Sequence, residues 1–471
     1  MQGRDEVMKF NRLDEADIRE LSSMVPSDRF STGESNLRLH SRDQSRHCGI
    51  SPEAVIWPND QAEVSGILKY ANHRLIPVTP WGSGSSLEGN PVPAKGGIVL
   101  DFSRMNRILE IREAEFQADV EPGVIYQDLN ESLRHNGLFF PPDPGARATI
   151  GGMIANNASG TRTVRYGATR DNILRLSVVL ANGDIIETGT RASKTSSGYD
   201  LIHLFTGSEG TLGVLTNATV RLAGLPVEFS AAVATFPNVE AAAGAVFEII
   251  RAGCDPAFLE LLAPECVELM NKEMSLGLKP SPTLFMEFHG ISETQPAEIL
   301  GIAEYICEEQ GCEEFRPGLG RDERNRLLKA RHDMAEMIRR NHPDCSPIVI
   351  DVAVPLTAYG RMIGLAGKEV RDSGIPGYIF SHAGDGNIHL HFEGRSGDEK
   401  VWQTIERINE RIVSEALKAG GTATGEHGVG MGKRRFMEQE HGESLKWMKQ
   451  IKHVFDPNGI LNPGKIFPDV E

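Results

Sequence analysis

The fold of the first half of this chain is decided by the stretch Thr149-Ile-Gly-Gly-Met-Ile-Ala-Asn-Asn-Ala-Ser-Gly160. Small residues stand at nearly every position, so something other than side chains must fill the space beside the loop. Asn156, Asn157 and Ser159 supply hydrogen bonds of the kind that a heterocycle or a pyrophosphate uses. The stretch therefore predicts a loop that holds a cofactor.

Two more glycine-rich loops accompany it. The upstream loop, Pro80-Trp-Gly-Ser-Gly-Ser-Ser-Leu-Glu-Gly89, follows an expected strand and can present several backbone N–H groups to one phosphate. It lacks the Gly-x-Gly-x-x-Gly pattern of nicotinamide-binding proteins, because Leu87 replaces the third glycine and no acidic residue follows at the required spacing. The downstream loop is Gly207-Ser-Glu-Gly-Thr-Leu-Gly213. Three such loops favour a large, flat, phosphate-bearing cofactor over three ordinary turns.

Between Glu53 and about Leu222, short apolar runs separated by Gly/Pro loops predict strands, with one helix at Gln61–Asn72. The dipeptide Asn182-Gly183 predicts a hairpin turn between two of these strands. The expected strands are Ala54–Trp57, Ile76–Thr79, Ile98–Asp101, Phe116–Val120, Leu176–Leu180, Ile185–Thr188 and Val214–Leu222.

The pattern changes at Gly224-Leu-Pro226, after which strands and helices are mixed. Such a pattern predicts a sheet covered on one face by helices. The expected strands are Phe229–Thr235, Ala257–Leu262, Thr283–Phe288, Ile348–Val354, Tyr378–Phe380 and Ile388–Phe392, and the expected helices are Val239–Ala252, Glu298–Gln310 and Leu356–Asp372. From Gly420 to Phe467 the chain returns to glycine-rich loops, as though it docks back on the first domain.

Length and composition limit the alternatives. A chain of 471 residues is too long for one core, so we expect more than one domain. The pattern of strands and helices predicts an α+β protein divided at 1–50 (a polar helical lead-in), 51–223, 224–419 and 420–471. The net charge of −16, with no Lys/Arg-rich run, disfavours nucleic acid as a partner. Six scattered cysteines predict neither a disulfide framework nor an iron–sulfur cluster, so redox chemistry needs a bound cofactor.

The sequence has no apolar stretch of roughly 18 residues and no signal-peptide core, which predicts a cytoplasmic protein. Peripheral contact with a membrane and the oligomeric state, a homodimer included, stay open.

A metal site is predicted by His382-Ala-Gly-Asp-Gly-Asn-Ile-His389 together with Gly425-Glu-His-Gly428. Two imidazoles and one carboxylate suit a catalytic divalent ion, since open positions remain for a substrate. The two histidines are seven residues apart and would lie on opposite faces of an extended strand, so Gly384 and Gly386 must bend the segment. These residues alone leave hydrolysis open beside other metal-assisted reactions.

The three loops resemble the FAD-binding domain of the vanillyl-alcohol oxidase/para-cresol methylhydroxylase (PCMH) family. The second half, with its His382–His389 segment, Gly421–Gly428 and Phe455–Gly464, resembles the branch that contains D-lactate dehydrogenases, the glycolate oxidase D-subunit and D-2-hydroxyglutarate dehydrogenase. The resemblance implies a PCMH-type FAD-binding domain, a ferredoxin-like α/β substrate (cap) domain, and a C-terminal segment that returns to the first domain.

The resemblance also implies which residues contact FAD. Covalent members of the family often carry a histidine in the first loop, where this chain has Ser85 and Ser86, so we expect noncovalent FAD. The implied contacts are Trp81, Gly82, Ser83, Gly84, Ser85, Ser86, Gly89, Pro142, Asp143, Gly145, Thr149, Gly151, Gly152, Ala155, Asn156, Asn157, Ser159, Gly160, Tyr166, Gly167, Glu209, Gly213, Val214 and Asn462.

For catalysis, the resemblance implies that His382, His389 and Glu426 bind Zn²⁺ or Mn²⁺, which ligand type does not separate. His427 is then the base that takes a proton from the hydroxyl of a 2-hydroxy acid, and Arg331 is the clamp for its carboxylate. His391 is either a fourth ligand or an ordinary strand residue.

The expected substrate is a small D-2-hydroxy acid, D-lactate first and glycolate second. In the branch that oxidises the diacid, a lysine stands where this chain has Val349 and a threonine where it has Ala335, so a second carboxylate would lack partners. Electrons must pass to a quinone, a cytochrome or an iron–sulfur partner. The alternatives are a glycolate oxidase FAD subunit that needs an iron–sulfur partner, D-2-hydroxyglutarate dehydrogenase, and a metal-dependent hydrolase.

Overall fold

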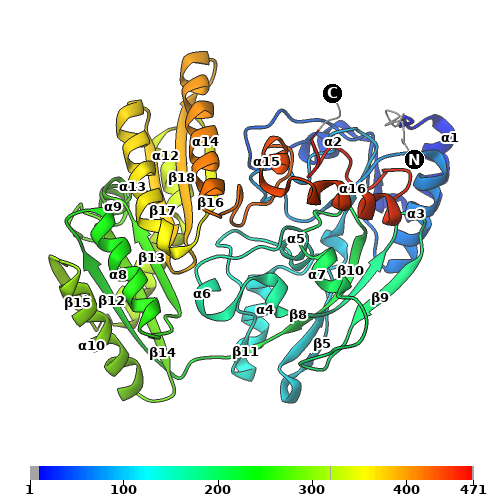
Figure 1. The fold of residues 1–471 in the computed structure, drawn as a ribbon. Helices are drawn as coiled ribbons and strands as arrows, with labels where there is room; N and C mark the ends of the chain where they lie inside the picture. Colours follow the sequence, from blue (N-terminus) through cyan, green and yellow to red (C-terminus); the bar gives the residue numbers. More distant parts are fainter. Residues whose placement is uncertain (1–9, 319, 469–471) are drawn as a thin grey trace.

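A computed structural model describes residues 10–318 and 320–468 of the chain. Figure 1 shows two halves, one blue to cyan-green and the other green to orange, with the red C-terminal segment lying on the first half. Within the described residues, no helix is both long enough and apolar enough to span a membrane.

The first half begins with a four-stranded sheet in the order β1-β2-β4-β3. Strands β2, β4 and β3 are parallel, and helix α3 connects β2 to β3. Asp60 caps α3 by accepting hydrogen bonds from two backbone N–H groups, and the buried residues Val64, Ile67, Leu68 and Ala71 form its inner face. The bounds are β1 Phe30–Ser31, β2 Ala54–Ile56, α3 Gln61–Arg74, β3 Val78–Trp81 and β4 Ile98–Asp101.

A five-stranded antiparallel sheet, in the order β5-β6-β10-β8-β9, completes the first half. The predicted Asn182-Gly183 turn does join the paired strands β8 and β9. The bounds are β5 Ile108–Arg112, β6 Gln117–Val120, β8 Ile173–Val179, β9 Ile185–Gly189 and β10 Val214–Arg221. The small elements around them are α4 Tyr126–Leu133, β7 Leu138–Phe139, α5 Ile150–Asn156, α6 Thr163–Tyr166, α7 Leu201–Phe205 and β11 Ala223–Gly224.

The predicted loop at Thr149–Gly160 contains the short helix α5, a correction to the sequence analysis. Thr149 caps α5 by accepting a hydrogen bond from the Gly152 N–H at 3.2 Å, and Asn157 ends it in a left-handed conformation. The glycines hid this helix from the sequence pattern because they have a low helix propensity.

The second half is built on a seven-stranded antiparallel sheet in the order β15-β12-β14-β13-β17-β18-β16. The strand bounds are β12 Glu228–Thr235, β13 Phe258–Leu262, β14 Thr283–Gly290, β15 Glu314–Pro317, β16 Cys345–Ala353, β17 Gly377–His382 and β18 Asn387–Arg395.

Helices cover both faces of this sheet, not one face as predicted. Every residue of β13 is buried, because Leu259 and Leu261 enter one hydrophobic core while Phe258 and Leu262 enter another. The first core is covered by α8 Val239–Arg251, α10 Thr294–Glu309, α13 Leu356–Ser373 and α14 Glu399–Lys418. The second is covered by α9 Pro264–Met274, α11 Arg321–His332 and α12 Met334–Asn341.

The ends of the described chain pack onto the first half. Helices α1 Glu15–Ser23 and α2 Glu34–Leu39 precede β2, and Leu21 joins the core beside α3. At the other end, α15 Met437–His441 and α16 Ser444–Phe455 lead to a parallel bridge between Leu461 and Val78 of β3. The C-terminal segment therefore returns to the first domain, as expected.

Candidate active site

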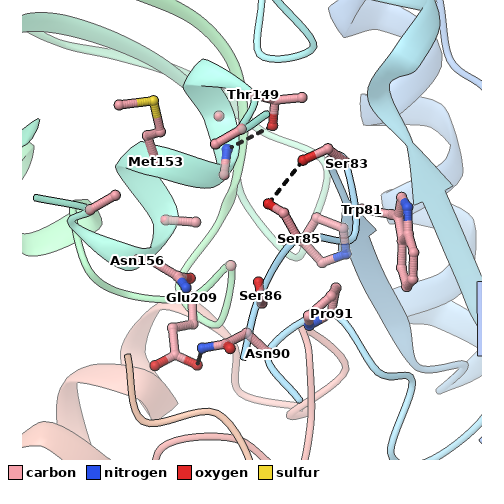
Figure 2. Close-up of a pocket in the computed structure, with 18 of the residues that line it drawn as sticks. Trp81, Ser83, Ser85, Ser86, Asn90, Pro91, Thr149, Met153, Asn156 and Glu209 are labelled. Carbon is pink, nitrogen blue, oxygen red and sulfur yellow. Dashed lines mark hydrogen bonds between the residues drawn. The ribbon is translucent and has the colours of Figure 1, made fainter. Parts of the chain in front are cut away.

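A pocket opens among the predicted loops of the first half (Figure 2). Its walls come from the loop after β3, from α5, from the loop at Glu209 and from the C-terminal segment. The predicted FAD contacts that line it are Trp81, Gly82, Ser83, Gly84, Ser85, Ser86, Thr149, Gly151, Gly152, Ala155, Asn156, Glu209, Gly213 and Asn462.

Close packing against neighbouring side chains explains why the pocket walls are glycine-rich. A Cβ atom at Gly82 would lie 2.4 Å from Thr149 Oγ1, and one at Gly151 would lie 2.6 Å from the Cβ of Pro122. The walls therefore expose backbone and short hydroxyl side chains, among them the hydrogen-bonded pair Ser83 and Ser85 (Figure 2). Such a cradle fits a large cofactor with a phosphate bridge.

Glu209 joins this pocket to the segment that follows His427. Its buried carboxylate accepts hydrogen bonds from Asn90 Nδ2 at 2.9 Å and from the backbone N–H groups of Val429 and Gly430 at 2.6 and 2.9 Å. Burial raises the pKa of Glu209, and these donors oppose the rise. Asn462 adds a bond from its Nδ2 to the Glu209 carbonyl at 2.7 Å.

Other predicted FAD contacts lie outside the lining of this pocket. Asn157, Ser159 and Gly160 line a neighbouring cavity together with His382. Tyr166 reaches the second half, where its hydroxyl lies 3.0 Å from His289 Nδ1. The remaining residues outside the lining are Gly89, Pro142, Asp143, Gly145, Gly167 and Val214.

The two predicted metal histidines lie on a tight hairpin, β17 to β18, with a 3₁₀ turn between the strands. Gly386 bends this turn with a φ of +70°, and a Cβ there would lie 2.1 Å from the Val354 carbonyl oxygen. The glycine-dependent bend was predicted correctly.

Glu426 lies between the two imidazoles. Its Oε2 is 3.6 Å from His382 Nε2 and its Oε1 is 3.4 Å from His389 Nε2. One ligand atom from each of the three residues falls within 4.8 Å of the others, and all three side chains are largely buried. This donor set fits a divalent metal such as Zn²⁺ or Mn²⁺.

His427 lies against the same cluster. Its ring stacks on that of His389 with centroids 5.2 Å apart, and its Nε2 is 3.5 Å from Glu426 Oε1. The buried Nδ1 atoms of both histidines have no hydrogen-bond partner within the described part of the chain. Asp351, His389 and His427 form a second group with ligand-atom spacing.

Asp351, which sequence reasoning missed, fixes the position of this loop. Its Oδ2 accepts hydrogen bonds from the backbone N–H groups of Glu426 and His427 at 2.9 and 3.1 Å, and from Thr424 Oγ1 at 2.9 Å. Burial acts to raise the Asp351 pKa, but the nearby cationic groups of His427 and Lys433 outweigh it and hold the pKa well below its usual range.

Glu260 was also missed. It lies on β13, directly opposite His382 in the sheet, and is fully buried. Its carboxylate accepts hydrogen bonds from His382 Nδ1 and from Arg331 Nε, each at 2.7 Å. Arg331, predicted from the family resemblance alone, therefore reaches the cluster through Glu260.

Burial and the nearby carboxylates shift the pKa values of the clustered histidines in opposite directions. Burial acts to lower the pKa of His382, but Glu260 and Glu426 raise it to about 10, so metal binding must displace a proton there. Burial lowers the pKa of His389 to about 3, which leaves this ring neutral. For His427, burial favours the neutral ring, but Asp351 and Glu426 outweigh it and raise the pKa.

His391, left open above, belongs to neither group of metal-ligand spacing in the described residues. Its Nε2 lies 2.9 Å from Glu393 Oε1, two residues along β18. Val349 pairs with His391 in the sheet and lines a separate cavity with Glu88 and Lys433.

Two family models match most of the chain. Residues 52–189 match the family described as "FAD binding domain", and residues 225–466 match "FAD linked oxidases, C-terminal domain". These matches define an FAD-linked oxidoreductase.

Individual relatives match this chain over nearly its full length. The chain is 37% identical to a protein named "Probable D-lactate dehydrogenase, mitochondrial" from Danio rerio, covering 95% of this chain and 91% of the relative. It is 37% identical to "Glycolate oxidase subunit GlcD" of Bacillus subtilis, covering 96% and 97%. The crystal structure of p-cresol methylhydroxylase with bound substrate has a TM-score of 0.75 at 17% identity, with 96% of each chain covered. The chain belongs to the vanillyl-alcohol oxidase/PCMH family of FAD-linked oxidases, and it is homologous to D-lactate dehydrogenases and GlcD.

Proposed function

We propose that this protein uses noncovalent FAD and a divalent metal, Zn²⁺ or Mn²⁺, to oxidise a small D-2-hydroxy acid, D-lactate first, to the 2-oxo acid. One observation carries the proposal: Glu426 and His427 line the cofactor pocket, and the same two residues belong to the groups with metal-ligand spacing. A hydroxy acid bound at the cluster would thus face the cofactor.

The oxidation removes a hydride from Cα and a proton from the hydroxyl. When bound, the metal would acidify the hydroxyl of the substrate and the flavin would accept the hydride. His427 takes the proton, because its ring lines the cofactor pocket and its Nε2 lies 3.5 Å from Glu426 Oε1. Arg331 holds the substrate carboxylate, since its buried Nη2 has no other hydrogen-bond partner in the described residues.

Residue types support a monocarboxylic substrate. In the branch that oxidises the diacid, a lysine and a threonine stand where this chain has Val349 and Ala335, so by this resemblance a second carboxylate would lack those partners. The name of the Danio rerio relative supports D-lactate, and that of the Bacillus subtilis relative supports glycolate as the second candidate. The D configuration rests on this kinship alone.

The two electrons must then leave the flavin. The six cysteines are all free, and none belongs to a group with metal-ligand spacing in the residues described. We propose an external acceptor, namely a quinone, a cytochrome or an iron–sulfur partner protein. The second candidate function, a glycolate oxidase FAD subunit, differs in its substrate and in needing an iron–sulfur partner for turnover.

The test is anaerobic stopped-flow reduction of the purified flavoprotein by D-lactate, L-lactate, glycolate and D-2-hydroxyglutarate, with metal analysis of the same sample. Fast bleaching of the flavin by D-lactate is expected, with about one metal per chain. If glycolate reduces the flavin faster than D-lactate does, glycolate replaces D-lactate as the proposed substrate. A folded but colourless protein, or one whose flavin no 2-hydroxy acid reduces, would overturn the proposal. If D-lactate reduces the flavin but the purified protein does not pass electrons on to an artificial dye, the protein is a subunit that needs a partner for turnover.

A further inference from the structure

One buried carboxylate connects the candidate metal site to the candidate substrate clamp. Glu260 uses Oε1 for His382 Nδ1 and Oε2 for Arg331 Nε, so each oxygen has a different partner. The three side chains come from β13, α11 and β17, and each is less than a tenth exposed. None of the three can shift without breaking a charge-assisted hydrogen bond.

We propose that Glu260 is a positioning residue, which fixes the tautomer and orientation of His382 for metal binding and holds Arg331 at a set place beside the metal. The inference rests on the proposed function, because that function assigns the metal and the substrate carboxylate to these two partners.

The chemistry of the imidazole ring explains how Glu260 prepares His382 for metal binding. An imidazole that donates Nδ1–H to Glu260 carries its lone pair on Nε2 when it is neutral. That Nε2 is the atom facing Glu426, 3.6 Å from its Oε2. Carboxylates that receive the second N–H of a metal-binding histidine orient the ring and make it a stronger ligand.

The arginine side is similar. Glu260 occupies Nε of Arg331, and the Phe380 ring lies 4.7 Å from the guanidinium carbon. One edge and one face of the guanidinium are thereby held, while Nη2 keeps a buried donor without a partner in the described residues. A fixed N–H group of Arg331 is thereby left for a substrate carboxylate. The distance of this N–H group from His382 is set by the two carboxylate oxygens of Glu260.

The neighbouring strand β14 carries a matched control. Glu287 is equally buried and also joins a histidine to an arginine, with His289 Nε2 and both Nε and Nη2 of Arg324 as its partners. The second ring nitrogen of His289 is engaged, however, since Nδ1 lies 3.0 Å from the Tyr166 hydroxyl. The Glu287 group thus offers no ring nitrogen to a metal, and replacing Glu287 reports only the structural cost of losing such a carboxylate.

The experiment compares Glu260→Gln, Glu260→Asp and Glu287→Gln with the native flavoprotein. Each protein is stripped of metal with a chelator and titrated calorimetrically with Zn²⁺ and with Mn²⁺, and its melting temperature and flavin spectrum are recorded. Glu260→Gln should bind metal 10- to 100-fold more weakly, because an amide cannot accept from both partners. Glu260→Asp keeps the charge but is one methylene shorter, so it should weaken binding as well. Glu287→Gln should bind metal as the native protein does.

Substrate kinetics add a second readout. Both Glu260 variants should raise the KM for the hydroxy acid through Arg331, whereas Glu287→Gln should not. Native metal affinity in a folded Glu260→Gln protein would overturn the inference, as would equal losses in Glu260→Gln and Glu287→Gln, or a native protein that binds neither ion. If Glu260→Gln fails to fold, native metal affinity in Glu260→Asp would overturn it instead. Because the titrations need no substrate, they stand apart from a failure of flavin reduction.

Discussion

The carboxylate of Asp351 and the backbone of His427 are joined by a hydrogen bond of 3.1 Å between residues 76 positions apart. Because Asp351 lies on β16 and is fully buried, the bond ties the loop of the candidate base to the sheet of the second half. The base is therefore held by backbone as well as by side-chain contacts.

Replacing Asp351 by Asn should cost about 3 kcal/mol of stability and slow flavin reduction by at least about 100-fold, because four donors bind the two carboxylate oxygens, and an amide NH2 would face one of these donors instead of accepting from it. Chemical denaturation and stopped-flow absorbance measure the two effects. Thr424→Val removes one donor only and should give a small fraction of either effect. Equal losses in both variants would contradict the role given to Asp351.

His427→Ala should leave FAD and metal bound while the rate of flavin reduction falls by about 10² to 10⁴, the usual contribution of a general base. The flavin spectrum and metal content are checked on the sample used for stopped flow. His391→Asn serves as the control for a buried histidine outside the metal groups, and it should keep its metal. A His427→Ala enzyme with the native reduction rate would remove His427 from the mechanism.

His382→Ala should lose the metal and weaken substrate binding, unlike His427→Ala. It removes one ligand of three and leaves Glu260 without its histidine partner. Metal analysis after gel filtration should show less than a tenth of the native content, and chelator treatment should inactivate the native enzyme until metal is added back. Full activity of His382→Ala after chelation would exclude the metal from the reaction.

The ionised Asp17 side chain in the N-terminal segment should stabilise the folded protein, and this stabilisation should be lost in acid. Burial acts to raise its pKa, but hydrogen bonds from Arg74 and Tyr70 outweigh it and lower the pKa from 3.8 to about 2. The folded pKa lies below the unfolded one, so the stabilisation is complete above about pH 4 and is lost as the pH falls through 2. At pH 7, Asp17→Asn should cost about 1 kcal/mol, because Arg74 is partly exposed and solvent screens the ion pair.

Urea unfolding of the native protein and of Asp17→Asn, at several pH values from 7 to 2.5, measures this contribution. The difference between the two proteins should shrink toward the acid end. A difference that stays constant with pH would show that the Asp17 charge is not responsible.

Much of the fold could be predicted because local patterns encode it. The Asn-Gly turn, most of the longer strands and the glycine bend between His382 and His389 all depend on residues close in sequence, whereas β5 and β15 were not expected. The second helical layer was missed, since a strand such as β13, buried on both faces, does not alternate.

The candidate site was predicted only where a motif carried it. Glu260 and Asp351 carry no local signal, because their roles come from partners reached through sheet register and loop docking. Glu260 and His382 are 122 residues apart in the chain and are neighbours only because β13 pairs with β17. Tyr166, predicted as an FAD contact, lies against His289 of the other half, and no local pattern encodes this contact.

The bridge between Val78 and Leu461 has a consequence for synthesis. Asn462 closes the cofactor pocket by donating to the carbonyls of Asn90 and Glu209, both made hundreds of residues earlier. The ribosome adds about 5 to 20 residues per second, so the sheets of the first half emerge many seconds before Asn462 does. FAD capture should therefore be completed only after Asn462 has emerged, because until then the nascent chain lacks one wall of the cofactor pocket.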